Sequence, residues 1–342
     1  MGTPEITIVV PIFNTEAEML RNCIKSIRKQ TFSDFELILI DDGSLNEVAD
    51  LCDLIAEDDN RIAVYHKRNE GVSVARNFGI DISKAPYITF IDADDWIEDN
   101  YLEILYDDIT SKNYDISMCT RSFETRKNSK ADNFFEINMV FDRNNKTELI
   151  KKTLTTGIGG TWCKMYNKGF LNDYGLKYDI RLRRTQDIIF NLYCFQYAEK
   201  IHYISKPLYH YRLNNTSVTH KYNKNISSIL TLAANEFTIF TKKFYNDNGV
   251  MQCLYWKHVS ILTEILKIDI FHKDTERRYI EKKGEIIRLC NLTPYKEAID
   301  MLEIKKLPLS SKVKIYCLKK EVVIVLQGLF CVQNEIHRRR LY

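Results

Sequence analysis

The sequence lacks an apolar run long enough to cross a membrane. The best candidate, Val322 to Val332, is shorter than the roughly 20 residues that a membrane helix needs. The 9 Cys residues are scattered without a Cys-x-x-Cys pair, which argues against a zinc site and against a disulfide scaffold. Because the N-terminus also lacks a basic and apolar signal segment, we expect a cytoplasmic protein with reduced thiols.

A strong charge of either sign is also absent, because the formal net charge is only +3 at pH 7. This argues against a dedicated nucleic-acid binder, and we expect no nucleic acid among the partners. With 45% hydrophobic and 28% charged residues, the 342-residue chain has the composition of a globular protein with room for two domains.

The sequence does contain a regular alternation of strand-like and helix-like segments. The strand-like segments are near-continuous apolar runs, which predict a parallel sheet covered by helices on both faces, a Rossmann-like α/β fold. The predicted strands span residues 6–11, 35–40, 62–66 and 87–91, with further strands at 116–123 and 133–141; the predicted helices span residues 17–29, 46–57 and 72–82. In such sheets ligands bind beyond the carboxyl ends of the strands.

Three acids stand within the four residues Asp92 to Asp95, directly after the predicted strand 87–91. Two carboxylates about 4 Å apart repel each other by roughly 4 kcal/mol at an effective dielectric near 20. A divalent cation removes that repulsion, and hard oxygen ligands suit Mg²⁺ or Mn²⁺. The alternative is an acidic loop in which Asp95 caps a helix that starts near Trp96.

The context of this cluster favours a binding site. Two other polar loops, Phe13-Asn14 and Asp41 to Ser44, also follow predicted strands. Because the carboxyl ends of parallel strands meet at one edge of the sheet, we expect all three loops to lie together there.

The character of the chain changes near Tyr222, after which helical periodicity dominates. We therefore expect a catalytic domain over residues 1–221 and a mainly helical region over residues 222–342. The segment from Lys305 to Tyr342 combines lysines with apolar residues and ends in Arg338-Arg339-Arg340. It fits peripheral binding to the inner face of the cell membrane, or a packed helix with a solvated basic face. Assembly into a homo-oligomer is left open.

Several stretches, taken in order, carry a resemblance to a known family. They are Val9 to Asn14, Ser26 to Phe32, Phe35 to Ser44, Asn69 to Gly79 and Asp92 to Asp95, followed more loosely by Trp162 to Tyr166, Arg184 to Phe190 and Tyr209 to Thr219. They resemble the family 2 glycosyltransferases of the bacterial surface-polysaccharide type, which have a GT-A fold. The resemblance is close over about the first 110 residues, and the last 120 or so carry none.

The resemblance implies a reaction in which a sugar moves from a nucleoside diphosphate to a hydroxyl of a glycan or lipid-linked saccharide. UDP is the expected nucleotide, because Asp41 can accept the uracil N3–H and Phe13 offers a stacking face, unless Phe13 packs in the core. The donor-binding positions implied by the resemblance are Pro11, Phe13, Asn14, Asp41, Arg76, Asp92 and Arg212. Arg76 is a diphosphate candidate that could instead pair with an acidic loop.

The expected cofactor is Mn²⁺ or Mg²⁺, held by Asp94 and Asp92, with His210 as a further ligand. For Asp95 three roles stay open: a loop residue, a helix cap or a contact to the sugar. Asp187 stands at the position of the catalytic base, and its alternative is a plain helix cap. A base opposite the leaving group implies inversion at the anomeric carbon, although spacing alone leaves a retaining mechanism open.

One position departs from the family pattern, which has Glu where this chain has Gln186. This departure leaves a non-catalytic nucleotide-sugar binding module as an alternative. A transferase that uses another nucleotide donor is a separate alternative. A processive polysaccharide synthase would add membrane spans and a Gln-x-x-Arg-Trp motif, and neither is present. A nucleotidyltransferase would need a Gly-rich loop after the first strand, where Pro11 to Asn14 stand instead.

Overall fold

The computed structural model describes residues 2–125, 128–213 and 222–330. The chain divides into two compact units, Met1–Leu213 and Asn214–Tyr342. The division predicted between residues 221 and 222 falls at the edge of the segment 214–221, which lies outside the described residues, and it stays a prediction. The Arg338-Arg339-Arg340 run also lies outside them.

The first unit contains one sheet whose leading half follows the predicted alternation. Its strands lie in the order β3, β2, β1, β4, and all three neighbouring pairs are parallel. Because β1 and β2 are buried almost throughout, their apolar runs are continuous rather than alternating. The elements of this half are β1 (Ile6–Ile12), α1 (Ala17–Arg28), β2 (Phe35–Asp41), α2 (Asn46–Glu57), β3 (Ile62–His66), α3 (Val72–Ile82) and β4 (Tyr87–Phe90).

The other half of the sheet is mixed. Next to β4 come β9, β6, β10 and β5, and among these pairs only β6 with β10 is parallel. The predicted α/β fold is thus confirmed, with a sheet that is parallel at one side and mixed at the other. Its elements are β5 (Trp96–Ile97), α4 (Tyr101–Ser111), β6 (Ile116–Glu124), β7 (Ser129–Asp132), β8 (Met139–Phe141), α5 (Lys146–Thr155), β9 (Lys164–Asn167), α6 (Lys168–Asp173), α7 (Gln186–Tyr197) and β10 (Ile201–Arg212).

The segment after the acidic cluster differs from one of the predicted alternatives. Trp96 begins the short strand β5, which pairs antiparallel with β10, and the next helix starts at Tyr101. The alternative that Asp95 caps a helix near Trp96 is therefore wrong. The strand ties the acidic loop to the end of β10.

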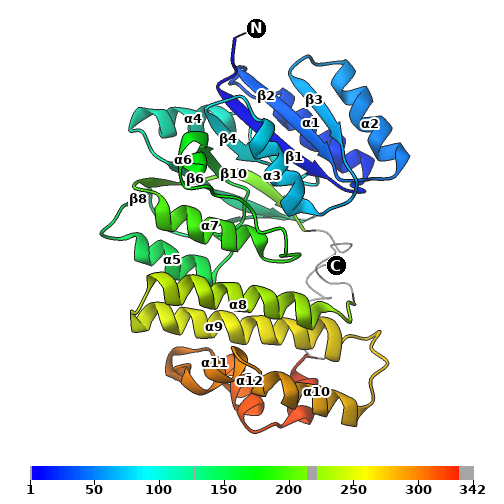
Figure 1. Ribbon diagram of the computed structural model, residues 1–342, viewed down its shortest axis with the longest axis vertical. Helices are drawn as coiled ribbons and strands as arrows, with labels where there is room; N and C mark the ends of the chain where they lie inside the picture. The colour runs from blue at the N-terminus through cyan, green and yellow to red at the C-terminus, as the bar shows by residue number, and fades with distance from the viewer. Residues whose placement is uncertain (1, 126–127, 214–221, 331–342) are drawn as a thin grey trace. The chain divides into compact units, whose positions relative to one another are not determined.

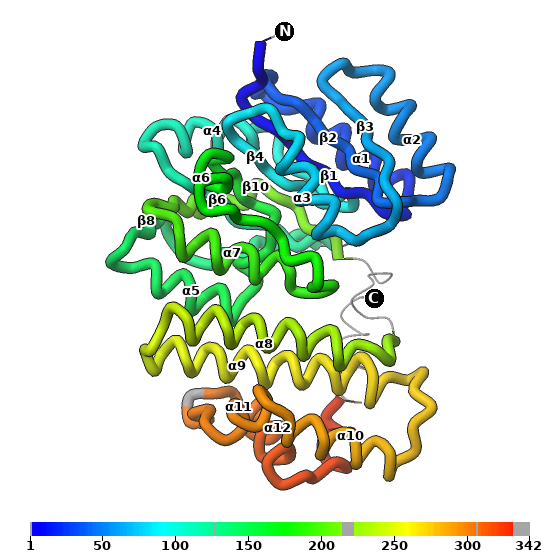
Figure 2. Tube along the Cα trace, viewed as in Figure 1, coloured from blue at the N-terminus to red at the C-terminus, as the bar shows by residue number. Residues whose placement is uncertain are grey.

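The second unit is helical in the part that the structure describes (Figure 1). The helices α8 and α9 lie side by side along their length, as Figure 2 also shows. No described helix is both long enough and apolar enough to span a bilayer. The elements are α8 (Ile226–Phe244), α9 (Asn248–Ile265), the π-helical turn η2 (Leu266–Ile270), α10 (Tyr279–Asn291), α11 (Tyr295–Met301), η3 (Ile304–Lys306) and α12 (Leu309–Lys319).

Candidate active site

The loops after β1 and β2 lie together at the carboxyl edge of the sheet. The strand register pairs Ile12 with Asp41. Asn14 connects the two loops, because its N–H donates to Ser44 Oγ at 3.0 Å and its side-chain oxygen accepts from the Leu45 N–H at 2.9 Å. Phe13 is 51% exposed, so the alternative that it packs in the core is wrong.

Asp41 is a buried carboxylate with a partner on each oxygen. Oδ1 accepts from the Ser44 N–H at 2.8 Å, and Oδ2 contacts His66 Nδ1 at 2.9 Å. Burial alone would raise the pKa of Asp41, but hydrogen bonds from Ser44 and His66 lower it below its ordinary value. Asp41 therefore stays ionised and keeps lone pairs for a further donor.

Asp42 holds the turn that starts α3. Its two oxygens accept from the N–H groups of Glu70 and Gly71 at 2.9 and 2.8 Å. Gly71 has a φ of 99°, a conformation that suits glycine, and Arg183 donates to the Glu70 carbonyl at 2.9 Å. These contacts fix the helix that carries Arg76.

Arg76 points from α3 into the acidic cluster and is buried. Its Nη2 donates to Asp92 Oδ1 at 2.7 Å, while Nε and Nη1 are buried without a hydrogen-bond partner among the described residues. Burial lowers the pKa of Arg76, but Asp92, Tyr178 and Asp187 more than offset this and raise it. The predicted pairing of Arg76 with an acidic loop is thus present, with two donors left over for an anion.

The acids of the cluster are not equivalent. Burial, followed by the charge of Asp92, raises the pKa of Asp94 to about 6. Burial and the charges of Asp94 and Asp92 raise the pKa of Asp95 well above its ordinary value. Asp95 accepts from Tyr209 Oη at 2.8 Å and from the Arg212 N–H at 2.8 Å, so it holds β10 against the loop.

Arg212 and His210 lie on β10 beside Trp96. Arg212 Nε donates to the Asp94 carbonyl at 2.9 Å, and its guanidinium lies 4.6 Å from the Trp96 ring centre. His210 stacks on Trp96 and contacts Glu124 and Glu98 at 2.8 Å through its two ring nitrogens. A metal ion at His210 would have to displace one of these carboxylates, so this ligand stays a prediction that the observed contacts do not favour.

Asp187 lies in the first turn of α7, near enough to Arg76 for its charge to act on the guanidinium. The charges of Asp92 and Asp187 both act on the Arg76 guanidinium, although the two acids are far apart in the sequence. Asp187 Oδ1 accepts from the Ile188 N–H at 2.9 Å. The neighbouring Gln186 has a buried Oε1 without a partner among the described residues.

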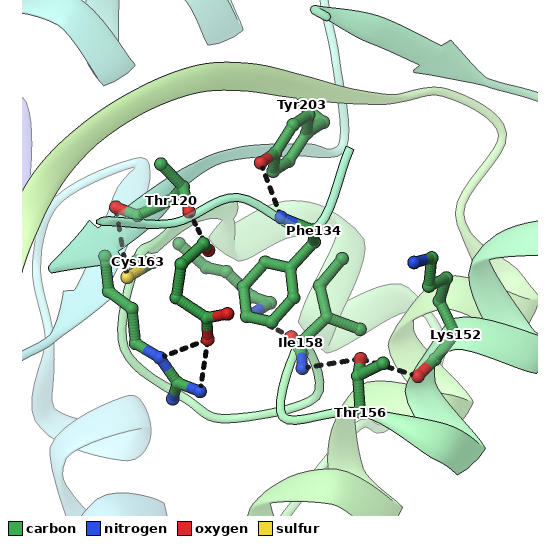
Figure 3. Close-up of polar contacts among 10 residues, drawn as sticks. Thr120, Phe134, Lys152, Thr156, Ile158, Cys163 and Tyr203 are labelled. Atoms are coloured by element: carbon green, nitrogen blue, oxygen red, sulfur yellow. Dashed lines mark hydrogen bonds and ion pairs between the residues drawn. The ribbon is translucent and has the colours of Figure 1, made fainter. Parts of the chain in front are cut away.

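The loop before β9 is held by a buried lysine that sequence reasoning did not single out. Lys164 Nζ donates to the carbonyl oxygens of Ile158 and Gly160 at 2.7 Å and of Trp162 at 3.3 Å. Burial lowers the pKa of Lys164 to about 8, and Asp187 is among the charges that oppose this. Figure 3 shows the same loop, with Ile158 beside Thr156 and Cys163 next to Thr120.

Other residues of the site were also missed, for a shared reason. Asp42 and Tyr209 stand in stretches that carry the resemblance, but their roles and that of His66 were not singled out. Their contacts join different strands or loops, and no local pattern marks such contacts. For His66 a signal was present, because it ends the third strand beside Asp41 in the parallel register. The predicted closing segment up to Thr219 continues outside the described residues.

The acidic loop fits a divalent cation in part. Within the described ranges, no group of three or more His, Cys, Asp or Glu side chains is arranged to hold a metal ion. Mg²⁺ usually needs only one or two carboxylates, because waters and substrate phosphates supply the remaining ligands. Asp94 and Asp92 meet that requirement, and the unpartnered donors of Arg76 suit the phosphates.

Comparison with known proteins identifies relatives of this chain. The model of the family described as "Glycosyl transferase family 2" matches residues 7–175. EpsH of Bacillus subtilis (strain 168) is 31% identical over 229 residues, which cover 66% of each chain. Glycosyltransferase GlyA of Streptococcus pneumoniae is 28% identical over 276 residues, or 78% of this chain. This chain thus spans slightly under two thirds of EpsH and 38% of GlyA.

A solved structure with the same fold covers nearly the whole chain. The crystal structure of S. aureus TarS 1-349 in complex with UDP-GlcNAc has a TM-score of 0.66 at 16% identity, over 99% of this chain and 93% of that one. At this identity the likeness concerns the fold alone. It confirms the GT-A architecture that the motifs predicted, with a helical region after it.

Proposed function

Because residues 7–175 match the model of glycosyl transferase family 2, we propose that the chain is a member of this family and moves a hexose or an N-acetylhexosamine from a UDP-sugar to a hydroxyl group. The proposed acceptor is a growing, lipid-linked bacterial surface glycan. The observation that carries the proposal is Arg76, whose buried guanidinium interacts with both Asp92 and Asp187. This supports a site in which a diphosphate and a base are neighbours.

The proposed uridine site is the edge formed by β1 and β2. The ionised Asp41 can accept the N3–H of uracil, and the exposed ring of Phe13 offers a stacking face, with Pro11 and Asn14 beside it. The UDP-GlcNAc bound by TarS, which has the same fold, supports this choice of nucleotide.

The proposed diphosphate site lies between Arg76 and the acidic loop. The unpartnered Nε and Nη1 of Arg76 can donate to phosphate oxygens, and Arg212 supplies a second cation. A Mn²⁺ or Mg²⁺ ion held by Asp94 and Asp92 would neutralise the charge that develops on the leaving diphosphate. Asp95 is assigned no part in this, because Tyr209 and Arg212 already occupy its oxygens.

Asp187 is the proposed general base. Its carboxylate takes the proton of the acceptor hydroxyl while that oxygen attacks the anomeric carbon on the face opposite the diphosphate. A carbon–oxygen bond to the acceptor forms as the bond to the β-phosphate oxygen breaks, and the electron pair leaves with UDP. The anomeric carbon is therefore inverted.

The Asp187→Asn variant tests this assignment. We expect transfer to fall about 10²–10⁴-fold, because the amide cannot accept the proton, while UDP affinity stays almost unchanged. The measurements are UDP release under saturating donor and UDP binding by calorimetry. The matched control is Asp173→Asn, which changes an exposed acid of α6. Unaltered turnover in Asp187→Asn would remove Asp187 from the mechanism.

A non-catalytic nucleotide-sugar binding module is the second candidate. The observation behind it is Gln186, whose buried Oε1 has no partner among the described residues and which stands where the family resemblance implies a Glu. The same release assay with a panel of UDP-, GDP- and TDP-sugars decides between the candidates. Binding without release of any nucleotide would favour the module, and release from another nucleotide would change the donor.

A further inference from the structure

His66 stands at the end of β3, directly beside Asp41 at the end of β2. The two residues are partners in the parallel register, and His66 Nδ1 lies 2.9 Å from Asp41 Oδ2. On its other side, His66 Nε2 lies 3.1 Å from Asp53 Oδ1 on α2. The side chain of Asp41 is 4% exposed, whereas those of His66 and Asp53 are 42% and 58% exposed.

The two contacts define the protonation of the ring. An ionised carboxylate can only accept hydrogen bonds, so both ring nitrogens must donate and the imidazole is a cation. Hydrogen bonds to Asp41 and Asp53 raise the pKa of His66, which agrees with this geometry. A ring that lost one proton could keep Nδ1–H toward the buried Asp41 and give up the contact with the exposed Asp53.

We propose that His66 is a specificity-determining positioning residue, which holds the Asp41 carboxylate ionised and in one orientation so that uracil is accepted and cytosine is rejected. The inference rests on the proposed UDP donor and adds the residue that selects its base. His66 itself need not touch the nucleotide, since it acts through Asp41.

The chemistry of the two bases explains the selection. Uracil presents an N–H at ring position 3, which an ionised carboxylate can accept. Cytosine presents a lone pair there, which an ionised carboxylate repels and a protonated carboxyl group can bind as a donor. Anything that lets Asp41 take up a proton therefore weakens the discrimination between UDP and CDP.

Ser44 and His66 are the described partners of the Asp41 carboxylate, and of the two only His66 can carry a charge. Cys52 lies close by in the core, and burial raises its pKa to about 12, so it carries no charge at neutral pH. Lys67, the next residue after His66, forms an ion pair with Glu70 at 3.3 Å. Among the described ion pairs, His66 is the cation that contacts the Asp41 carboxylate.

The test compares UDP and CDP binding by calorimetry in the full-length His66→Gln variant. We expect the UDP dissociation constant to rise about tenfold, as for loss of a hydrogen bond between charged groups, with CDP affinity unchanged or tighter. The donor KM should rise with it, while kcat at saturating donor stays within about twofold. An unchanged ratio of UDP to CDP affinity would overturn the inference.

Two controls separate this role from a general structural one. Asp53→Asn removes the outer partner and should change the ratio by less than about twofold, because Nδ1–H can still reach Asp41. His202→Gln removes a different histidine–aspartate contact, with Asp108 at 2.6 Å on the other side of the sheet, and should leave the ratio unchanged. A loss of selectivity in His202→Gln as large as in His66→Gln would count against the inference.

Two further outcomes distinguish a failure of this inference from a failure of the proposed function. A wild-type protein that does not prefer UDP to CDP would contradict the uridine site itself. If His66→Gln does not fold, nitrogen NMR of the wild-type ring at pH 7 replaces it. A proton on Nδ1 supports the proposed role of His66, and a ring whose Nδ1 carries no proton contradicts it.

Discussion

Asp94 is an acid of the loop that forms no ion pair with any described side chain. Its carboxyl has a pKa raised to about 6, because burial and Asp92 disfavour the anion. Its neighbours differ: Asp92 pairs with Arg76, and Asp95 is held by Tyr209. The proposed metal therefore depends on Asp94 more than on the other acids of the loop.

The Asp94→Ala variant tests that dependence at the residue scale. We expect the tightening of UDP binding by Mn²⁺ to disappear, because one carboxylate remains and Arg76 already occupies it. Calorimetry with and without Mn²⁺ measures this. Asp99→Ala, a change to an exposed acid in the same connection, should keep the Mn²⁺ effect. If Asp94→Ala also keeps it, the proposed metal position is wrong.

Single residues also show which parts of the site a sequence can reveal. Phe13, Asp41 and Asp94 follow predicted strands, so the topology of a parallel sheet brings them together before any contact is known. Tyr209 holds Asp95 from 114 positions away, and His66 holds Asp41 from 25 positions away. Such partners depend on strand order and rotamers, which local patterns do not specify.

At the scale of elements, the packing of α8 against α9 contains a buried histidine. His258 is 2% exposed, its Nε2 contacts the Ala234 carbonyl at 3.1 Å, and its Nδ1 has no partner among the described residues. Burial lowers the pKa of His258 to about 4. In the unfolded chain the same group would titrate near 6.5.

This difference predicts acid sensitivity of the second unit. Below pH 6.5 His258 takes up a proton in the unfolded chain but stays neutral in the folded protein. The free energy of unfolding therefore decreases as the pH falls from 6.5 toward 4. The loss is about 1.4 kcal/mol per pH unit, or about 2 kcal/mol by pH 5. In His258→Gln, whose amide can still donate to Ala234, we expect this part of the loss to vanish.

Calorimetric melting at pH 7.5 and pH 5 measures the effect. The wild-type protein should lose more stability between the two conditions than His258→Gln does, and the gap should be concentrated in the transition of the second unit. Equal losses in the two proteins would mean that His258 is protonated in the folded state. A variant that melts much lower at pH 7.5 would instead indicate that the glutamine does not fit.

The elements also differ in how well the sequence predicted them. The strands β1 to β4 were predicted closely. For β1, β2 and β4 the reason is that strands buried on both faces are continuous apolar runs. The predicted strand over residues 133–141 is wrong for most of its length, since β8 covers only Met139–Phe141. The backbone N–H of Phe134 donates instead to Tyr203 Oη at 3.1 Å, a tertiary contact that overrides strand propensity.

At the scale of the whole molecule, the second unit has no counterpart among the motifs that identified the first. The last described part of this unit, α12 and the residues after it, belongs to the segment that was predicted to contact the membrane. The buried residues Ile315, Cys317 and Leu318 pack α12 into the unit. Exposed apolar residues lie along and just after the same helix: Leu309, Tyr316, Ile324 and Val325. Truncation at Lys305 would remove both sets and could not separate folding from membrane binding.

Substitutions on the exposed face separate the two. If these exposed residues bind anionic bilayers, Lys319→Gln with Lys320→Gln should weaken sedimentation with phosphatidylserine vesicles about 30-fold at low salt, at about 1 kcal/mol for each lysine. Leu309→Ser with Ile324→Ser should weaken it further through lost apolar burial. Lys282→Gln with Lys283→Gln on α10 is the matched control and should have little effect. Equal sedimentation of all variants would mean that the basic face is only solvated, which is the other alternative that the sequence left open.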